Sequence, residues 1–185
     1  MKKNIAVFLD RDGTIIHDKN YLSDPSKVVL YKGTPEAIRK LQKAGFKIVV
    51  VTNQSGIGRG YFTESDYKKV NAKMISLLKT AGVKLDAVYY CPHITADECS
   101  CRKPDTKMAL DAEKKLNLDL KKSYVIGDNT RDIEFGNRVG AKGILVLTGH
   151  GKRYARKINK NNKPIAVTKN IISASNIILH DKKNA

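Results

Sequence analysis

Phe8-Leu9-Asp10-Arg11-Asp12-Gly13-Thr14 is the stretch of sequence from which the fold follows, because an apolar run ends there at two carboxylates. The run over residues 5–9 is continuous, which favours a strand buried on both faces of a parallel sheet. Side chains at i and i+2 of an extended chain leave the same face, so Asp10 and Asp12 are expected to point together into the crevice beyond the strand. A solvated Asp-Gly turn is the alternative explanation of this motif taken alone.

Apolar runs and helical patterns alternate along the rest of the chain. Thr34 is a candidate helix N-cap, and Thr63 with Asp66 resembles a capping box. The predicted strands cover residues 46–51, 87–90, 124–126, 144–147 and 165–167, and the predicted helices cover residues 34–44, 63–81, 106–116, 132–139 and 171–178. This alternation implies right-handed crossovers and an α/β fold with a parallel sheet.

Polar residues at the ends of the predicted strands should therefore meet along one edge of the sheet. They are Asp10, Thr52, Cys91 and Asp128. If Asp10, Asp12 and Asp128 surround a Mg²⁺ ion, the metal offsets the charge of a phosphate group and makes Asp10 usable as a nucleophile.

The remaining steps of a phosphate transfer also have candidate residues. Asp12 could protonate the leaving alcohol and later activate water. Thr52 could hold a phosphate oxygen, and Arg102 and Lys103 supply cations opposite the metal. The sequence thus predicts hydrolysis of a phosphate monoester through an aspartyl phosphate.

All three cysteines of the chain lie close together, and one histidine accompanies them. Three thiols and one imidazole form a complete tetrahedral set for Zn²⁺, and an odd number of cysteines argues against a disulfide framework. We expect a structural zinc in the loop 91–103, where it would fix Arg102 and Lys103, although three ordinary thiols and an exposed histidine remain the alternative. The expected ligands are Cys91, His93, Cys99 and Cys101. The other histidines, among them His150, are expected at the surface.

Composition limits the class of protein. The chain has 185 residues, of which 41% are hydrophobic and 29% charged, so we expect a single domain over residues 1–185. No apolar run approaches the roughly 18 residues that span a bilayer, and the N-terminal apolar run is too short for a secretory signal, so a cytoplasmic protein without membrane contact is expected.

The net charge of +17 points to anionic partners. A basic segment over residues 152–164 contains no acidic residue. It could steer a phosphorylated substrate or contact nucleic acid, but a mobile solvated loop explains it equally well, and we assign it no role.

Four motifs resemble those of the haloacid dehalogenase superfamily of phosphatases. They are Asp10-x-Asp12-Gly13-Thr14, Thr52-Asn53-Gln54, Arg102-Lys103-Pro104 and Gly127-Asp128-x-x-x-Asp132. Cys-Pro-His with Cys-x-Cys-Arg-Lys-Pro is similar to the zinc-bearing branch that lacks a cap domain.

The resemblance implies a Rossmann-like three-layer sandwich with a mainly parallel central sheet, a zinc-binding loop and no large cap. It also implies Asp10 as nucleophile, Asp12 as general acid/base, and Asp128 with the Asp12 carbonyl as magnesium ligands. Thr52 and Lys103 would bind phosphate, and Asn53 belongs to the same substrate-binding motif.

The substrate is less sharply indicated. The branch contains heptose 1,7-bisphosphate phosphatases and histidinol-phosphate phosphatases, and the motif around Arg59 looks like the former, so the expected reaction is removal of the 7-phosphate of D-glycero-D-manno-heptose 1,7-bisphosphate. Arg59 would then contact the sugar or the distal phosphate. Asn129 departs from the pattern, because both groups usually carry a basic residue there.

Other functions stay open at this point. A histidinol-phosphate phosphatase, a polynucleotide 3′-phosphatase and a zinc-stabilised anion-binding module without catalysis are the alternatives. Nucleic acid is not the expected partner, because Tyr154 is the one aromatic residue in the basic segment. We expect a monomer acting on a small phosphorylated metabolite.

Overall fold

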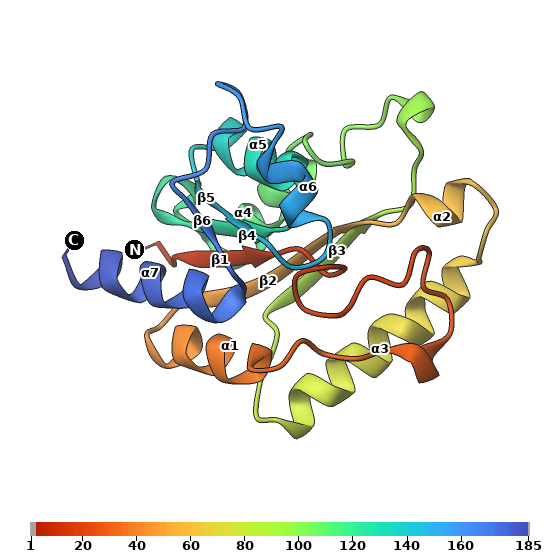
Figure 1. Cartoon of the computed structure of the whole chain (residues 1–185), viewed down its shortest axis with the longest axis horizontal. Coiled ribbons are helices and arrows are strands. Elements are labelled where there is room, and N and C mark those ends of the chain that lie inside the picture. Colours follow the sequence, from red (N-terminus) through yellow and green to blue (C-terminus); the bar gives the residue numbers. More distant parts are fainter. Residues whose placement is uncertain (1–2, 185) are drawn as a thin grey trace.

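A single six-stranded parallel sheet runs through the molecule (Figure 1). The computed structural model describes residues 3–184. The strands lie in the order β3-β2-β1-β4-β5-β6. Their bounds are β1 Ala6–Leu9, β2 Lys47–Asn53, β3 Ala87–Cys91, β4 Tyr124–Gly127, β5 Lys142–Val146 and β6 Ala166–Thr168. The predicted α/β class with a Rossmann-like parallel sheet is confirmed.

Helices cover both faces of this sheet (Figure 1). On one face lie α1 Thr34–Lys43, α3 Glu64–Thr80 and α7 Ile171–Lys183, and on the other lie α4 Lys107–Leu116 and α5 Thr130–Arg138. The central strand β1 feeds both cores, because Val7 and Leu9 pack into one cluster while Ala6 and Phe8 pack into the other. A strand buried on both faces has to be continuously apolar, which explains the run before Asp10.

Several local details differ from the sequence predictions. Thr34 is the first residue of α1, and Gly33 precedes it as N-cap with φ of 80°. Strand β2 extends through Thr52 to Asn53, so these two residues end the strand instead of following it. Helix α5 begins at Thr130, earlier than the predicted Asp132. The predicted capping box of Thr63 and Asp66 is present at the start of α3.

Short helices escaped prediction altogether. They are α2 Ser55–Gly58, α6 Gly151–Ala155 and three 3₁₀ turns, η1 Pro25–Lys27, η2 Thr95–Asp97 and η3 Leu120–Lys122. One helical turn has no room for an apolar stripe, so the periodicity that reveals longer helices is missing. Helix α6 contains the first residues of the basic segment 152–164, and the lysines and arginines of that segment are exposed.

No helix among residues 3–184 is both long and apolar enough to cross a membrane. Over the same residues the connections between strands hold helices and loops, and no large cap is inserted between them (Figure 1). The rim of the sheet is consequently left to loops.

Helix α5 is anchored to the sheet by an aromatic pair, which gives the first testable prediction. The rings of Phe135 and Phe8 pack edge to face with centroids 6.1 Å apart, and both side chains are fully buried. We expect Phe135→Ala to lower the free energy of unfolding by about 3–5 kcal/mol, because it removes buried contacts and leaves a cavity. Denaturant titration measures this change.

The matched control is Leu110→Ala in α4, since the Leu110 side chain is 50% exposed. This variant should stay within about 0.5 kcal/mol of the wild type. An equal loss in both variants would contradict the proposed anchoring.

Candidate active site

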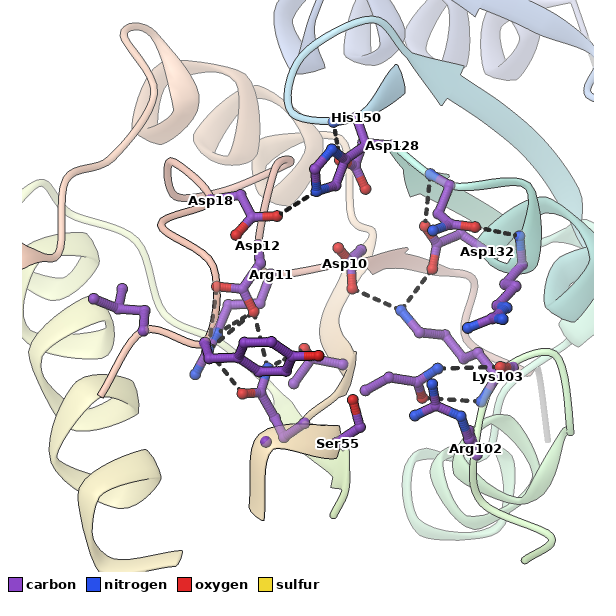
Figure 2. Close-up of a pocket in the computed structure, with 18 of the residues that line it drawn as sticks. Asp10, Arg11, Asp12, Asp18, Ser55, Arg102, Lys103, Asp128, Asp132 and His150 are labelled. Carbon is purple, nitrogen blue, oxygen red and sulfur yellow. Dashed lines mark hydrogen bonds and ion pairs between the residues drawn. The ribbon is translucent and has the colours of Figure 1, made fainter. Parts of the chain in front are cut away.

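The carboxyl ends of β1, β2 and β4 open into a pocket of about 410 Å³ (Figure 2). Its walls come from the segments after these strands, from the loop that leads to Lys103 and from the turn at His150. Ligands of open α/β sheets bind at this edge, so the position agrees with the convergence predicted from the strand ends. The rest of the site is built around a buried ion-pair cluster on the pocket floor.

Lys103 lies between two buried carboxylates (Figure 2). Its Nζ is 2.7 Å from Asp10 Oδ1 and 2.6 Å from Asp132 Oδ1, and it donates a third bond of 2.7 Å to the carbonyl of Val51. Three acceptors use all three donors of the ammonium group. Lys103 is thus fixed beside the carboxylate that the sequence predicts as nucleophile.

Three carboxylates form a cluster that could hold a metal ion. One oxygen each of Asp10, Asp128 and Asp132 lies within 4.8 Å of the others, and all three residues are buried. One oxygen of Asp128 accepts a bond of 2.6 Å from the backbone N–H of His150. Buried carboxylate oxygens without enough cationic partners are a donor set that suits a hard divalent cation.

Gly13 allows the loop after β1 to pass close to this cluster. A Cβ atom at Gly13 would lie 2.1 Å from Asp128 Oδ2, and the φ of Gly13 is 80°. Both the space and the backbone conformation therefore require glycine at this position of the Asp-x-Asp-Gly motif.

The carboxylate of Asp12 lies outside that cluster and is turned toward Arg11 (Figure 2). Its Oδ2 is 2.9 Å from Arg11 Nη2 and accepts a bond of 2.8 Å from Gln54 Nε2. Both aspartates line the pocket beyond the strand, as expected, but their carboxylates have different partners, because that of Asp12 contacts Arg11 and Gln54 and does not join the cluster. The strand ends at Leu9, so the alternation of an extended chain does not reach Asp12.

The predicted phosphate-binding residues all line the pocket. Thr52 is buried, and its Oγ1 accepts a bond of 2.8 Å from Gln54 Nε2. Asn53 uses both ends of its amide on the backbone of Lys103, at 3.1 and 3.0 Å. Arg102 donates to the carbonyl of His93 at 3.1 Å, whereas Arg59 is exposed on the rim.

Asn129 stands where a basic residue was expected, and its side chain has a structural role at the start of α5. Its side chain caps α5 and accepts a bond of 3.0 Å from the backbone N–H of Arg131. Arg131, two residues further along the chain, is exposed and lines the pocket.

The loop 91–103 gathers the four residues that the sequence predicts as zinc ligands. Their ligand atoms lie within 4.8 Å of one another. Cys91 Sγ is 3.5 Å from His93 Nδ1 and 3.0 Å from Cys101 Sγ, and Cys99 Sγ is 3.5 Å from Cys91 Sγ. A tetrahedral ion with bonds of about 2.0–2.3 Å needs ligand separations of this order.

Several residues of the pocket have no role assigned from the sequence, among them His150 and Asp132. His150 was expected at the surface, and its side chain is 50% exposed, yet it lines the pocket and its Nε2 lies 3.0 Å from Asp18 Oδ2. Asp132 belongs to the motif that begins at Gly127, but the motif does not reveal its contact with Lys103. The contacts of His150 with Asp18 and of Asp132 with Lys103 join residues that are distant in the sequence, so no local pattern predicts them.

Comparisons with known proteins agree with this geometry. A protein-family model described as HAD-hydrolase-like matches residues 100–174. The chain is 44% identical to a probable D-glycero-D-manno-heptose-1,7-bisphosphate 7-phosphatase of Thermoplasma volcanium, over 72% of this chain and 92% of that protein. It is 42% identical to a D-glycero-beta-D-manno-heptose-1,7-bisphosphate 7-phosphatase of Pasteurella multocida, over 80% and 84%. The chain belongs to the haloacid dehalogenase superfamily. It is a phosphatase of that superfamily.

Solved structures of other haloacid dehalogenase phosphatases share the whole fold. A D,D-heptose 1,7-bisphosphate phosphatase from B. bronchiseptica, complexed with magnesium and phosphate, superposes with a TM-score of 0.88 at 29% identity and covers 96% of this chain and 99% of that one. A D,D-heptose 1,7-bisphosphate phosphatase from Burkholderia thailandensis gives 0.73 at 32% identity, over 95% and 99%.

The electrostatics of this haloacid dehalogenase site favour added positive charge. Burial raises the pKa of Asp10 to about 7, and the ion pair with Lys103 only partly offsets this effect. Burial also raises the pKa of Asp128 to about 8, and the charges of Asp10 and Asp132 raise it further. For Lys103 burial lowers the pKa, but the two carboxylates outweigh burial and raise it. The cluster thus has more carboxylates than one lysine can balance.

These raised pKa values predict how the stability of the magnesium-free protein depends on pH. The pKa of an aspartate in the unfolded chain is about 3.9, so the folded protein holds more protons and loses stability as the pH rises from about 4 through 8. Asp128→Asn removes one such carboxyl. We expect its free energy of unfolding, relative to the wild type, to increase by about 1 kcal/mol or more between pH 5 and pH 9.

Urea titrations at the two pH values in magnesium-free buffer measure this difference. Asp111→Asn on the exposed face of α4 serves as control and should show no such increase. A difference for Asp128→Asn that does not change with pH would contradict the prediction.

Proposed function

We propose that this phosphatase removes the 7-phosphate of D-glycero-D-manno-heptose 1,7-bisphosphate through an aspartyl phosphate on Asp10. The observation that carries the reaction is the position of Asp10, which directly follows the central strand at the pocket floor, 2.7 Å from the fixed ammonium group of Lys103. Support for the substrate comes from the relatives, which are named heptose bisphosphate 7-phosphatases.

Asp10 attacks the phosphorus atom, and the bond from phosphorus to the leaving oxygen breaks. Lys103 lies beside the attacking carboxylate, where its charge can also stabilise the phosphate oxygens in the transition state. Asp132 also pairs with Lys103, so the ammonium group stays in place when the Asp10 carboxylate bonds to phosphorus. The aspartyl phosphate is then hydrolysed by water.

We assign the metal of this site as Mg²⁺, with Asp10 and Asp128 and the Asp12 carbonyl as ligands. The buried oxygen donors with raised pKa values fit a hard cation of this kind. When bound, Mg²⁺ supplies positive charge that keeps the carboxylates ionised and offsets the charge of the phosphate.

Asp12 gives a proton to the leaving alcohol as the phosphorus–oxygen bond breaks, and takes one back from the water that attacks the aspartyl phosphate. The Thr52 hydroxyl is free to donate to a phosphate oxygen, because its own oxygen already accepts from Gln54. The two residues therefore act on opposite ends of the bond that breaks.

Three arginines suit a second phosphate of the substrate. Burial lowers the pKa of Arg102, and the like charges of Arg131 and Arg59 lower it further. All three line the pocket, so their repulsion is relieved by an anion between them. A bisphosphate carries such a second anionic group.

The test is release of phosphate in the presence of Mg²⁺ from four compounds. They are the α and β anomers of heptose 1,7-bisphosphate, histidinol phosphate and a 3′-phosphorylated oligonucleotide. We expect one heptose bisphosphate anomer to lead in kcat/KM by about a hundredfold, or some 2.7 kcal/mol of transition-state binding. Asp10→Asn should abolish turnover while the protein stays folded.

Two other results of this phosphate-release test would contradict parts of the proposal. Preference for histidinol phosphate or the oligonucleotide would overturn the substrate and keep the reaction. Equal activity of Asp10→Asn would overturn Asp10 as nucleophile.

We further propose a structural zinc held by the cluster of Cys91, His93, Cys99 and Cys101. Four protein ligands would close its coordination shell and leave no open position for catalysis. Cys101 directly precedes Arg102, and Arg102 donates to the carbonyl of His93, so the cluster fixes the segment that carries Lys103 into the pocket.

Cys99→Ser tests the zinc proposal, because it removes one thiolate and keeps the size of the side chain. We expect about one zinc per wild-type chain by elemental analysis, less metal in the variant, and a melting temperature lower by several degrees. Ser100→Ala is the neighbouring control and should keep both. A wild-type protein without zinc would contradict the proposal.

A further inference from the structure

We propose that Arg11 is a positioning residue that, together with Gln54, holds the Asp12 carboxylate in place for proton transfer. This inference rests on the proposed function, since it requires Asp12 to be the general acid/base. The sequence placed Arg11 between the two aspartates without giving it a role.

The contacts of Arg11 form a fork around one carboxylate. Its Nε donates to Asp12 Oδ2 at 3.0 Å and its Nη2 donates to Asp12 Oδ1 at 3.2 Å (Figure 2). Two parallel bonds from a planar guanidinium fix both the distance and the plane of a carboxylate. A lysine or an amide could not do so with one group.

Gln54 completes the fork and links it to the phosphate side of the pocket. Its Oε1 accepts from Arg11 Nη2 at 3.0 Å, while its Nε2 donates to Asp12 Oδ2 and to Thr52 Oγ1, each at 2.8 Å. The proposed proton donor and the proposed phosphate ligand are thus held by the same side-chain amide. Their separation is set by the protein before any substrate binds.

The guanidinium itself is fixed from behind. The side chain of Arg11 is 1% exposed, and its Cζ atom lies 5.3 Å from the centre of the Tyr67 ring on α3. The Tyr67 ring therefore covers one face of the guanidinium and the Asp12 carboxylate binds its edge, which leaves the group little rotational freedom.

Stability alone does not explain an arginine here. Arg11 Nη1 is buried and has no hydrogen-bond partner among the described residues. Burying a charged group with an unpaired donor costs folding free energy, and an apolar side chain of similar size would avoid that cost. We therefore infer that Arg11 is present because it positions the Asp12 carboxylate.

The test uses two substrates that differ in their need for a general acid. Heptose 1,7-bisphosphate releases an alcohol, which must be protonated, whereas p-nitrophenyl phosphate releases a phenolate that leaves without a proton. We expect Arg11→Met to lower kcat about thirtyfold or more on the heptose bisphosphate and less than about threefold on p-nitrophenyl phosphate. Inhibition by inorganic phosphate should change less than about twofold.

Asp12→Asn is the reference for this pattern. If it lacks the dependence on the leaving group, the proposed role of Asp12 fails. If it shows the dependence and Arg11→Met does not, the role of Arg11 alone is overturned. An equal loss on both substrates in Arg11→Met would mean a merely structural role.

Two more variants keep the test decisive. Arg138→Met removes another arginine that pairs with two carboxylates, Asp105 at 2.8 Å and Glu134 at 2.7 Å, but lies outside the pocket lining. It should leave both activities unchanged. If Arg11→Met does not fold in a thermal melt, Gln54→Met removes the other half of the fork and must show the same selective loss, or the proposal is wrong.

Discussion

A buried lysine between two buried carboxylates is the interaction on which the site depends. Lys103 reaches Asp10, directly after the central strand, and Asp132 on α5 from a loop that is distant from both in the sequence. Each of these ions would be costly to bury alone, and together they lower that cost by direct contact. The balance is incomplete, because Asp128 adds a third carboxylate to one ammonium group. That remaining negative charge is what makes the pocket floor receptive to a metal ion.

The rest of the fold can be understood as the means of placing these charges. Strand β1 is buried on both faces, so its end is rigid, and Asp10 is held in place because it is the next residue. Asn53 at the end of β2 holds the backbone of Lys103 through both ends of its amide. The zinc that we propose for the cysteine and histidine cluster would fix the same loop at a second point. A lysine on a long flexible side chain thereby becomes a fixed charge, which electrostatic catalysis requires.

Asp10 and Asp12 are proposed to have different roles because their surroundings differ. Asp10 lies among carboxylates and one lysine, whereas Asp12 lies against a guanidinium and an amide. Two groups of the same chemistry, one residue apart, are thus given different environments and different proposed tasks. Among residues 3–184 no large cap covers the pocket, and Arg59, Arg102 and Arg131 line it, where we propose that they bind the second phosphate of the substrate.

The sequence by itself determined the parallel sheet, the order of its elements and the strand-end position of Asp10, Thr52, Cys91 and Asp128, because buried strands and their polar ends are local patterns. It also indicated the cysteine cluster, whose members are close along the chain. Only the tertiary structure decided the direction of the Asp12 carboxylate, the place of Asp132 beside Lys103, the use of Asn53 as a clamp and the contact of His150 with Asp18. Each of these depends on a partner brought from another segment by folding, and no local pattern of residues records such a partner.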